Sequence, residues 1–379
     1  MDRPETSALF LYAERFLTYD LGNKHPLQQK RLKMVNDLLR AYGVLAPTGP
    51  IDHAEPRAAT EAEIARVHRD DFIEAVRKAG SGETSDRAYL SRFGIGPGDT
   101  PAFPGMYEAA ALYSGGTIEA TEALLSGRYR AAFNVAGGLH HAHPHRASGF
   151  CTFNDLAMGI HRFLEAGMER VLYVDIDAHH GDGTQNCFYD DPRVMTVSLH
   201  ESGQYLFPGT GFPEETGGPS APGTSLNVPL FPYTMDDVWH EAFDAVVPLA
   251  FERFRPQAVV LQLGADAHWE DPLAHLLLTS EGWMSAVRKL LDLSAGLPVT
   301  VTGGGGYNLR TVMRLWTMVA AACAGIELPN EVPEEIAART GVRFLHDEQV
   351  PDTEEDVRRK SRDYAREMVR RLHQALGID

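Results

Sequence analysis

The chain has 379 residues, of which 35 are Lys or Arg and 52 are Asp or Glu, so its formal net charge at pH 7 is −17. With 44% hydrophobic and 23% charged residues, it has the composition of a globular protein with a sizeable core, which excludes a largely disordered chain. The acidic balance argues against a general nucleic-acid binder, because phosphate contacts need clustered Lys and Arg. A cationic partner suits this charge better.

Three widely spaced cysteines, Cys151, Cys187 and Cys323, form no CxxC pair. This pattern excludes a disulfide framework and a thiolate zinc finger. Residues 1–7 carry acids and a proline where a signal peptide has basic and then apolar residues. No apolar run approaches the roughly 20 residues that a membrane span needs. The sequence therefore predicts a cytoplasmic protein with no membrane partner.

Short apolar runs alternate with longer amphipathic stretches along the chain. The apolar runs have the length and β-branched content of strands buried in a parallel sheet. They lie at residues 8–12, 131–136, 171–175, 194–199, 258–264 and 298–302. The amphipathic stretches predict helices at residues 27–42, 61–78, 114–126, 155–166, 235–254, 281–293 and 309–324. Repeated strand–helix units predict a single α/β sandwich domain with a central, mostly parallel sheet flanked by helices.

The predicted domain covers residues 1–330. Within it, residues 207–222 are rich in Gly and Pro, which predicts an irregular surface loop. Residues 331–379 are strongly charged and predict a helical extension that packs on the same domain, with its main helix at residues 352–376.

Acids and histidines follow the strand at residues 171–175 almost without a spacer. In an extended segment alternate side chains share a face, so Asp175, Asp177 and His179 are expected to project together. Their burial at a strand end is unfavourable unless a cation or hydrogen bonds satisfy them. Asp and His are ligands of Zn²⁺ and of other first-row divalent ions. The alternative interpretation is a polar loop with an Asp cap before the next helix.

A further carboxylate, Asp266, follows the strand at residues 258–264. Alone, an Asp in this position is usually a helix cap or a turn residue. If the two strands are neighbours, however, Asp266 supplies a third ligand beside Asp177 and His179. Three protein ligands with one open position are typical of a catalytic zinc site.

Four histidines lie within six residues after the strand at residues 131–136. His140 and His141 come first, and Asp175 and Asp182 are candidate partners for them. An imidazole oriented by a carboxylate is the arrangement of a general acid or base. An ordinary exposed loop is the alternative, and for His143 and His145 the sequence favours such surface positions without a role.

Four glycines, residues 303–306, separate the strand at residues 298–302 from Tyr307. Glycines allow the backbone to approach another group closely, and they leave Tyr307 free to move. A Tyr hydroxyl beside a Lewis acid is a good oxyanion donor. A phosphate-binding loop is disfavoured, because no Lys-Ser/Thr pair follows.

These four segments, in this order, resemble the histone deacetylase superfamily, which has the arginase-like α/β fold. The resemblance extends over residues 25–323 and includes further matching segments at residues 147–155, 193–200, 207–211 and 271–273. The sequence is most similar to the acetoin-utilisation branch, a bacterial group of protein lysine deacetylases.

The resemblance implies a role for each candidate residue of the reaction centre. The implied ligands of a catalytic zinc ion, or of ferrous iron in its place, are Asp177, His179 and Asp266. Tyr307 is the implied transition-state donor. His141, paired with Asp182, is the implied general base and acid, and His140 is the neighbouring histidine, paired with Asp175.

The resemblance also implies a channel for the acyl-lysine side chain. Gly149 would accept a hydrogen bond from the scissile amide through its carbonyl, Asp99 would hold the substrate backbone, and Arg31 would lie beneath the metal. The walls and mouth of the channel would be Phe150, Phe207 and Leu273. Two departures from the family pattern, residues 143–145 and 268–269, are expected near the rim and bear on substrate choice.

A structural potassium ion is implied as well. Its ligands would be Asp175, Asp177, His179, Ser198 and Leu199. A second potassium site is expected near Phe188 and Val194, where the surrounding residues match the family poorly.

The implied activity is zinc-dependent hydrolysis of acetyl-lysine in proteins to lysine and acetate. By resemblance to the acetoin branch, acyl-CoA synthetases are expected targets. An amidohydrolase acting on acetylpolyamines or other small molecules would use the same chemistry, and a non-catalytic module that binds acyl-lysine is the alternative from another class. A two-manganese ureohydrolase is disfavoured, because Gly181 and Gly264 stand where that family has metal-binding acids. The sequence does not indicate an oligomeric state.

Overall fold

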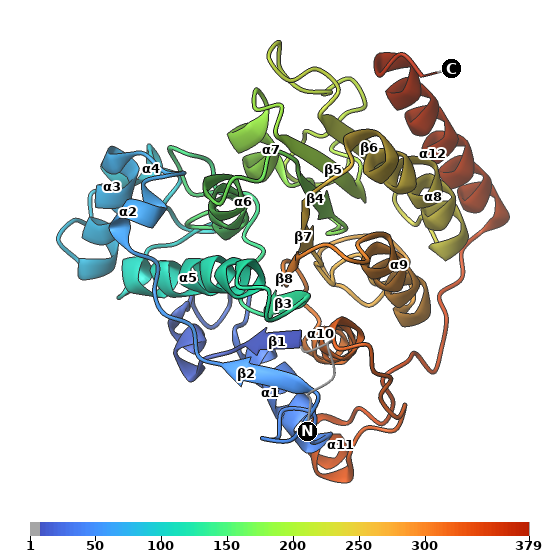
Figure 1. Cartoon of the computed structure of the whole chain (residues 1–379). Coiled ribbons are helices and arrows are strands. Elements are labelled where there is room, and N and C mark those ends of the chain that lie inside the picture. Colours follow the sequence, from blue (N-terminus) through green and yellow to red (C-terminus); the bar gives the residue numbers. More distant parts are fainter. Residues whose placement is uncertain (1–7, 379) are drawn as a thin grey trace.

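The computed structural model describes residues 8–378, so the prediction about a signal peptide lies outside the described range. Eight strands form one sheet in the order β2-β1-β3-β8-β7-β4-β5-β6, and every neighbouring pair is parallel (Figure 1). The strands are β1 (Ala8–Leu11), β2 (Ile51–Ala54), β3 (Ala131–Asn134), β4 (Val171–Asp175), β5 (Val194–Glu201), β6 (Ser225–Leu230), β7 (Ala258–Gln262) and β8 (Val299–Thr302). The predicted α/β class with a central parallel sheet is confirmed.

The two outermost strands, β2 and β6, were not among the predicted strands. In β2 only Ile51 is fully buried, because the strand lies at the sheet edge and carries Asp52 and His53 in the middle of its short sequence. The other edge strand, β6, is buried but contains Pro229, which lacks the N–H that a central strand needs. Edge positions tolerate such residues, so the apolar signal is weak there.

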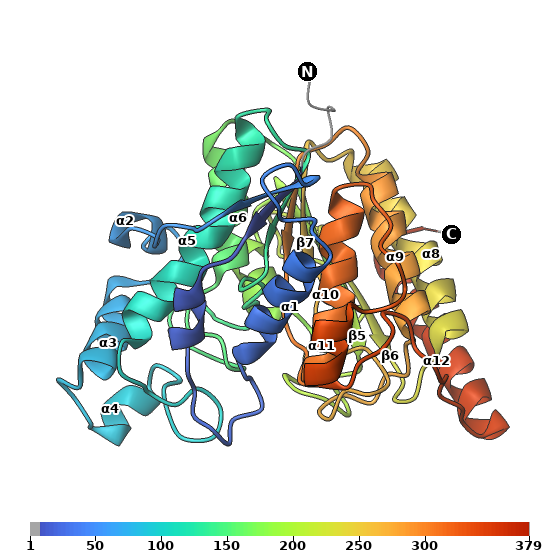
Figure 2. The ribbon, with the colours of Figure 1, turned by 90° about the horizontal axis from the view of Figure 1, so that it is seen from below.

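Helices cover both faces of the sheet. One layer contains α5 (Met106–Leu125), α6 (Asp155–Glu165) and α7 (Asp182–Phe188). The other contains α8 (Asp236–Phe254), α9 (Ser280–Leu293) and α10 (Leu309–Cys323), with α1 (Lys30–Ala41) packed on α10. Figure 2 shows α5 and α6 on one side of the strands, and α8, α9 and α10 on the other. Trp239, Trp283 and Trp316 are fully buried in the second layer.

Short helices lie outside these two layers, and two helix predictions need correction. The helix predicted at residues 61–78 consists of two, α2 (Glu61–Ile64) and α3 (Asp70–Ser81), because Arg69 adopts an extended conformation between them. The helix predicted at residues 114–126 begins earlier, at Met106, after Gly105 in a left-handed conformation. The remaining short elements are η1 (Glu14–Thr18), α4 (Arg87–Ser91) and α11 (Glu334–Thr340).

The charged extension contains the predicted helix, α12 (Glu355–Ala375), which packs against β6 and α8. The Tyr364 hydroxyl donates a hydrogen bond to Ser202 Oγ at 2.8 Å, and Arg371 forms an ion pair with Glu214. The boundary at residue 330 stays a prediction. Among the helices of residues 8–378, none is both long and apolar enough to cross a bilayer.

The sheet register brings the functional segments together. β3, β8, β7 and β4 are consecutive neighbours in the sheet, and each is followed by one of the four polar or glycine-rich segments that the sequence singles out. Asp175, the last residue of β4, lies beside Gln262 of β7 and Ser198 of β5. Because parallel strands end at the same edge, their carboxyl ends form the place where ligands bind in such folds.

Candidate metal centre and active site

Asp177, His179 and Asp266 converge at the carboxyl ends of β4 and β7. All three side chains are buried, and their ligand atoms lie within 4.8 Å of one another. His179 Nδ1 lies 3.1 Å from Asp177 Oδ1 and 3.0 Å from Asp266 Oδ2. The strand before Asp177 and the strand before Asp266 were expected to be neighbours in the sheet, and the pairing of β4 with β7 confirms this.

The surroundings of this cluster fit a cation. Burial disfavours a charged His179, but hydrogen bonds and charge from Asp177 and Asp266 outweigh it and raise the pKa of His179 well above its usual value. Burial and the charge of Asp177 raise the pKa of Asp266 to about 7, so an added positive charge favours the ionised form of both acids. The other groups that reach Asp177 Oδ2 are neutral donors, namely Gln262 Nε2 at 2.7 Å and the Gly305 N–H at 2.8 Å. Two carboxylates and an imidazole are a suitable donor set for one first-row divalent ion.

Glycines stand at the two positions where a second metal would need acidic ligands. A Cβ at Gly264 would lie 2.1 Å from Asp177 Oδ2, and a Cβ at Gly181 would lie 2.4 Å from Asp175 Oδ2. An acidic side chain at either position would collide with the carboxylates already present. The arrangement therefore opposes the second metal of a ureohydrolase.

His140 and Asp175 form the first of two buried His–Asp pairs. His140 Nδ1 donates to Asp175 Oδ2 at 2.8 Å, and the Tyr173 hydroxyl donates to the same oxygen. Burial disfavours the charged ring, but the carboxylates of Asp175 and Asp177 outweigh this effect and raise the pKa of His140 to about 9. His140 Nε2 lies 3.1 Å from His141 Nε2, so the protonated ring donates to its neighbour.

His141 and Asp182 form the second pair. His141 Nδ1 donates to Asp182 Oδ1 at 2.7 Å, which leaves Nε2 as the proton acceptor of the ring. Burial, together with the positive charge of His140, lowers the pKa of His141 to about 3. Two adjacent imidazoles with pKa values displaced in opposite directions are typical of an acid–base site.

The prediction that His143 is a surface histidine is wrong. Its side chain is buried, and its Nε2 lies 3.1 Å from Asp182 Oδ2. His145 is exposed, as expected. A tight turn, closed by the backbone bridge between His143 and Arg146, reverses the chain here. His143 lies at the start of the turn and is buried, whereas His145 lies within the turn and is exposed.

Tyr307 lies over the candidate metal cluster, with its ring centroid 6.4 Å from that of His179. Burial and the charges of Asp266 and Asp177 raise the pKa of Tyr307 well above its usual value, so its hydroxyl stays a proton donor. The glycines before it allow a close approach, since a Cβ at Gly305 would lie 2.0 Å from Asp266 Oδ2.

Two charged residues hold the Tyr307 backbone. Buried Arg31 donates to the Gly306 carbonyl at 2.8 Å and packs over the Trp316 ring. Asp271 Oδ2 accepts from the Tyr307 N–H at 2.8 Å.

The five residues predicted for the substrate channel lie in loops around this centre. The Phe207 ring packs edge-on against His141, with centroids 4.9 Å apart, and the Phe150 ring packs against Tyr307 at 5.8 Å. Asp99 is exposed, and its Oδ2 accepts from the Gly149 N–H at 2.9 Å. Leu273 is half-buried in the segment after Asp266.

A second cluster with metal-ligand chemistry lies nearby: His268, Glu270 and Asp347. Its acids are already balanced by buried Arg314, which donates to Asp347 Oδ1 at 2.8 Å and to Glu270 Oε2 at 3.2 Å. His268, expected near the rim, is fully buried and bonds to Asp347. We therefore regard this cluster as an ion-pair network.

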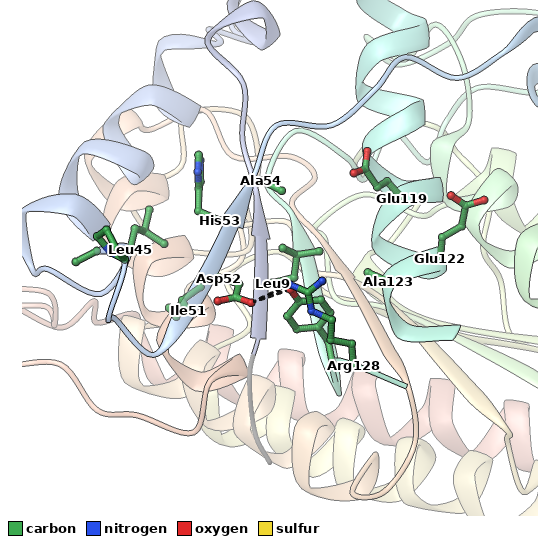
Figure 3. A pocket seen from close by; sticks show the side chains of 13 residues that line it. Leu9, Leu45, Ile51, Asp52, His53, Ala54, Glu119, Glu122, Ala123 and Arg128 are labelled. Atoms are coloured by element: carbon green, nitrogen blue, oxygen red, sulfur yellow. Dashed lines mark hydrogen bonds and ion pairs between the residues drawn. The ribbon is translucent and has the colours of Figure 1, made fainter. Parts of the chain in front are cut away.

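A pocket of about 680 Å³ opens at the far edge of the sheet, beside β2 (Figure 3). It is lined by residues that include Leu9, Ile51, His53 and Glu119. None of its lining residues belongs to the clusters described above.

Comparisons with known proteins agree with this geometry. A family profile described as the histone deacetylase domain matches residues 25–323. The chain is 41% identical to "Acetoin utilization protein AcuC" of Bacillus subtilis (strain 168) over 332 residues, which cover 86% of this chain and 85% of the relative. The chain belongs to the histone deacetylase family.

Further similar proteins agree with this family assignment. The protein of the same name from Staphylococcus xylosus is 36% identical over 339 residues, covering 88% of this chain and 87% of the relative. A crystal structure of a histone deacetylase homologue from Aquifex aeolicus has a TM-score of 0.85 and 29% identity, and the match covers 95% of this chain and 99% of that one. A homologue complexed with SAHA has a TM-score of 0.87 at 29% identity, covering 96% and 100%. The chain is thus a hydrolase of the deacetylase type, from a metal-dependent family that acts on acetylated substrates.

In this histone deacetylase family member, the residues suggested for potassium lie on the adjacent strands β4 and β5 and in the loop that follows β4. Ser198 and Leu199 are buried in β5, and Ser198 is the register neighbour of Asp175. The residues suggested for the second site, Phe188 and Val194, are buried at the end of α7 and the start of β5.

Sequence reasoning missed four residues that support the site: Gln262, Tyr173, Asp271 and His143. Gln262 binds Asp177 through Nε2, and it accepts from the Gly264 N–H through Oε1. A signal for it existed, since Gln262 is the polar residue in an otherwise apolar strand. No comparable signal marked Tyr173, because a tyrosine in a buried strand is ordinary.

Proposed function

We propose that the chain is a zinc-dependent protein lysine deacetylase, which hydrolyses the amide of acetyl-lysine to lysine and acetate. The observation that carries this proposal is a buried cluster of two aspartates and a histidine lying beside two His–Asp pairs and a tyrosine. Metal-dependent hydrolysis of an unactivated amide needs these parts, namely a metal ligand set, a base, an acid and an oxyanion donor.

Asp177, His179 and Asp266 would hold the zinc ion, for which ferrous iron is the alternative with the same donors. When bound, the ion polarises the acyl carbonyl and lowers the pKa of water. Gln262 and the Gly305 N–H orient Asp177 for this task, and the Ala178 N–H binds Asp266 Oδ1 at 2.8 Å. Such outer partners fix the position of ligand atoms before the ion arrives.

The histidine pair would move the protons. His141 Nε2 would accept the proton of the attacking water, which would replace His140 Nε2 as its hydrogen-bond partner, because the His141 Nδ1 proton is held by Asp182. With a pKa of about 9, His140 keeps a proton near neutral pH, so the pair retains an acid for the second step. The pair then protonates the departing lysine amine, whose ordinary pKa near 10.4 makes expulsion of the unprotonated group unfavourable.

Tyr307 would donate its hydroxyl proton in a hydrogen bond to the oxyanion of the tetrahedral intermediate. The acyl-lysine side chain would pass between Phe150 and Phe207, with Leu273 at the mouth. Asp99 would grip the substrate backbone, and the Gly149 carbonyl would accept from the scissile amide. Phe207 is 44% exposed, which suits a ring that is covered only when substrate binds.

We propose potassium as a structural ion, held by Asp175, Asp177, His179, Ser198 and Leu199, with the second site near Phe188 and Val194. KCl should then raise the melting temperature more than NaCl at equal ionic strength. Equal effects of the two salts would contradict it.

Turnover of a panel of acetyl-lysine peptides by zinc-reconstituted protein tests the function. Acetylputrescine serves as the small-molecule comparison, and a hydroxamate chelator serves as the inhibition control. We expect kcat/KM to be higher for peptides than for acetylputrescine and to be abolished by the chelator. The reverse preference would favour the small-molecule amidohydrolase, and binding of peptides without hydrolysis would favour an acyl-lysine-binding module.

Acetylated acyl-CoA synthetases are the proposed protein substrates, in the cytoplasm. The relatives named for acetoin utilisation support this choice. Loss of acetyl groups from such a synthetase, followed by mass spectrometry, is the expected result. An unchanged acetylation level beside active peptide hydrolysis would exclude this substrate.

A further inference from the structure

His143 contacts the reaction centre but has no part in the mechanism above. It lies in the loop after β3, and its side chain is 6% exposed. The backbone around it is fixed, because the His143 N–H donates to the Arg146 carbonyl at 2.9 Å and the His143 carbonyl accepts from His68 Nδ1 at 3.0 Å. A buried imidazole with a fixed backbone is a precise hydrogen-bonding group.

The neighbours of His143 determine which ring nitrogen carries the proton. Nε2 lies 3.1 Å from Asp182 Oδ2, and a carboxylate oxygen only accepts, so Nε2 must donate. Nδ1 faces Asn186 Nδ2 at 3.3 Å and accepts from it. Arg146 Nη2 lies 3.3 Å from the same Nε2; because both nitrogens carry protons in this arrangement, the contact is no hydrogen bond but places positive charge beside Asp182. The ring thus presents one proton to Asp182.

Asp182 is therefore held by two imidazoles. His141 Nδ1 donates to Oδ1 at 2.7 Å, and His143 Nε2 donates to Oδ2 at 3.1 Å. Burial opposes ionisation, but these two hydrogen bonds hold the pKa of Asp182 well below its usual range. With both oxygens engaged, the carboxylate cannot rotate away from His141 without breaking a second bond.

The other His–Asp pair has a similar support from different residues. Asp175 binds His140, and it is held in turn by the Tyr173 hydroxyl and by the Asp177 N–H at 3.1 Å. The carboxylate of each His–Asp pair therefore has a further hydrogen-bond partner, besides its own histidine, that fixes its orientation. For Asp182 that group is His143.

We propose that His143 is a positioning residue, which holds the Asp182 carboxylate so that His141 keeps its proton on Nδ1 and its lone pair on Nε2. This inference rests on the proposed function, in which His141 Nε2 accepts the proton of water. It assigns a role to a residue that touches neither the metal ligands nor the substrate.

Removal of the hydrogen bond should slow the reaction without weakening substrate binding. We expect His143→Leu to lower kcat by about 10- to 100-fold, the usual cost of losing an outer hydrogen-bond partner in a metal site, with KM little changed. His143→Gln keeps an N–H donor of similar reach, and it should restore most of kcat. His145→Gln, two residues away and exposed, is the matched control and should behave as wild type.

The experiment combines steady-state kinetics of zinc-reconstituted variants with ¹⁵N NMR of the imidazole nitrogens. In wild type, the His141 signals should report the Nδ1–H form, and in His143→Leu they should report a mixture of forms. Unchanged kcat and unchanged His141 signals in His143→Leu would overturn the proposal. Failure of His143→Gln to restore kcat above the Leu value would also overturn it, because a donor alone would then be insufficient.

The NMR measurement separates this proposal from the proposed function. If the wild-type protein hydrolyses no acetyl-lysine peptide, the function is wrong, but the His141 spectra of wild type and His143→Leu still test the positioning. If His143→Leu does not fold, wild type and His143→Gln remain, and absence of a proton on His143 Nε2 in wild type would overturn the proposal.

Discussion

Two clusters at the carboxyl end of the sheet have the same composition, one histidine and two acids, yet they differ in burial and in one charged neighbour. The first is Asp177, His179 and Asp266, and the second is His268, Glu270 and Asp347. In the first, the groups that reach the carboxylates from outside are neutral, such as Gln262 and the Gly305 N–H. In the second, the guanidinium of Arg314 bonds to both acids.

The difference shows that a list of donors does not define a metal site. A buried carboxylate needs a positive charge beside it, which a permanent side chain or a bound ion can supply. Arg314 supplies it in the second cluster through bonds of 2.8 and 3.2 Å. In the first, burial and the charge of Asp177 raise the pKa of Asp266 to about 7, and a divalent ion would supply the charge that favours its ionised form.

The two clusters also cooperate, because one segment of chain carries both. Residues 266–271 contain the third candidate ligand and two members of the ion-pair network. From this segment, Asp271 binds the Tyr307 N–H, and the Glu270 carbonyl accepts from Asn308 Nδ2 at 3.2 Å. The ion-pair network thus fixes the loop that presents Tyr307 to the other cluster.

The largest effect is expected for metal content. Asp266→Ala should lower metal affinity by more than about 100-fold, because it removes a ligand rather than an outer partner. Asp347→Ala, the matched change in the second cluster, should keep one equivalent. Metal analysis after exhaustive dialysis measures both, and a full equivalent in Asp266→Ala would refute the ligand assignment.

A smaller loss, confined to the reaction, is expected for Tyr307→Phe. Removing one oxyanion donor should lower kcat by about 10²–10³-fold and leave the metal bound. Peptide deacetylation and metal analysis of the same sample separate the two effects. A rate equal to wild type would remove Tyr307 from the mechanism.

Much of the fold follows from the sequence because the central strands are buried on both faces. Six continuous apolar runs marked the six interior strands, whereas β2 and β6 lie at the edges, where polar residues and Pro229 are tolerated. The helix break at Arg69 could not be read from the periodicity, because the apolar spacing continues across it.

The residues of the site were predictable where polar, ionisable side chains directly follow a strand. Asp177, His179, Asp266 and the His140–His141 pair all stand within a few residues of a strand end. His143 was misjudged because local spacing does not tell which side of a loop faces inward; the bridge to Arg146 decides it. The pairing of Arg314 with Asp347 joins residues far apart in the sequence, so no local pattern could indicate it.

A moderate loss of folding stability is expected when the buried cation Arg314 is removed. Arg314→Met should lower the free energy of unfolding by about 3 kcal/mol, because it leaves the acid Asp347 buried without its cation. Arg343→Gln, which breaks an exposed pair with Glu348, should cost less than about 1 kcal/mol. Urea unfolding at neutral pH measures both, and equal costs would mean that Arg314 does not compensate a buried charge.

The smallest effect is a pH dependence. Burial opposes ionisation of Asp347, but the hydrogen bond and charge of His268, with the Ser280 N–H and Arg314, hold its pKa well below its usual range. A lowered folded-state pKa contributes stability that is fully present above the unfolded pKa of about 3.9 and is lost as the pH falls below it. The destabilisation by Asp347→Asn should therefore be largest at pH 7.5 and smaller by about 1 kcal/mol at about pH 3. Urea unfolding of both proteins at the two pH values measures the change, and a pH-independent difference would show that Asp347 is held by packing rather than by its charge.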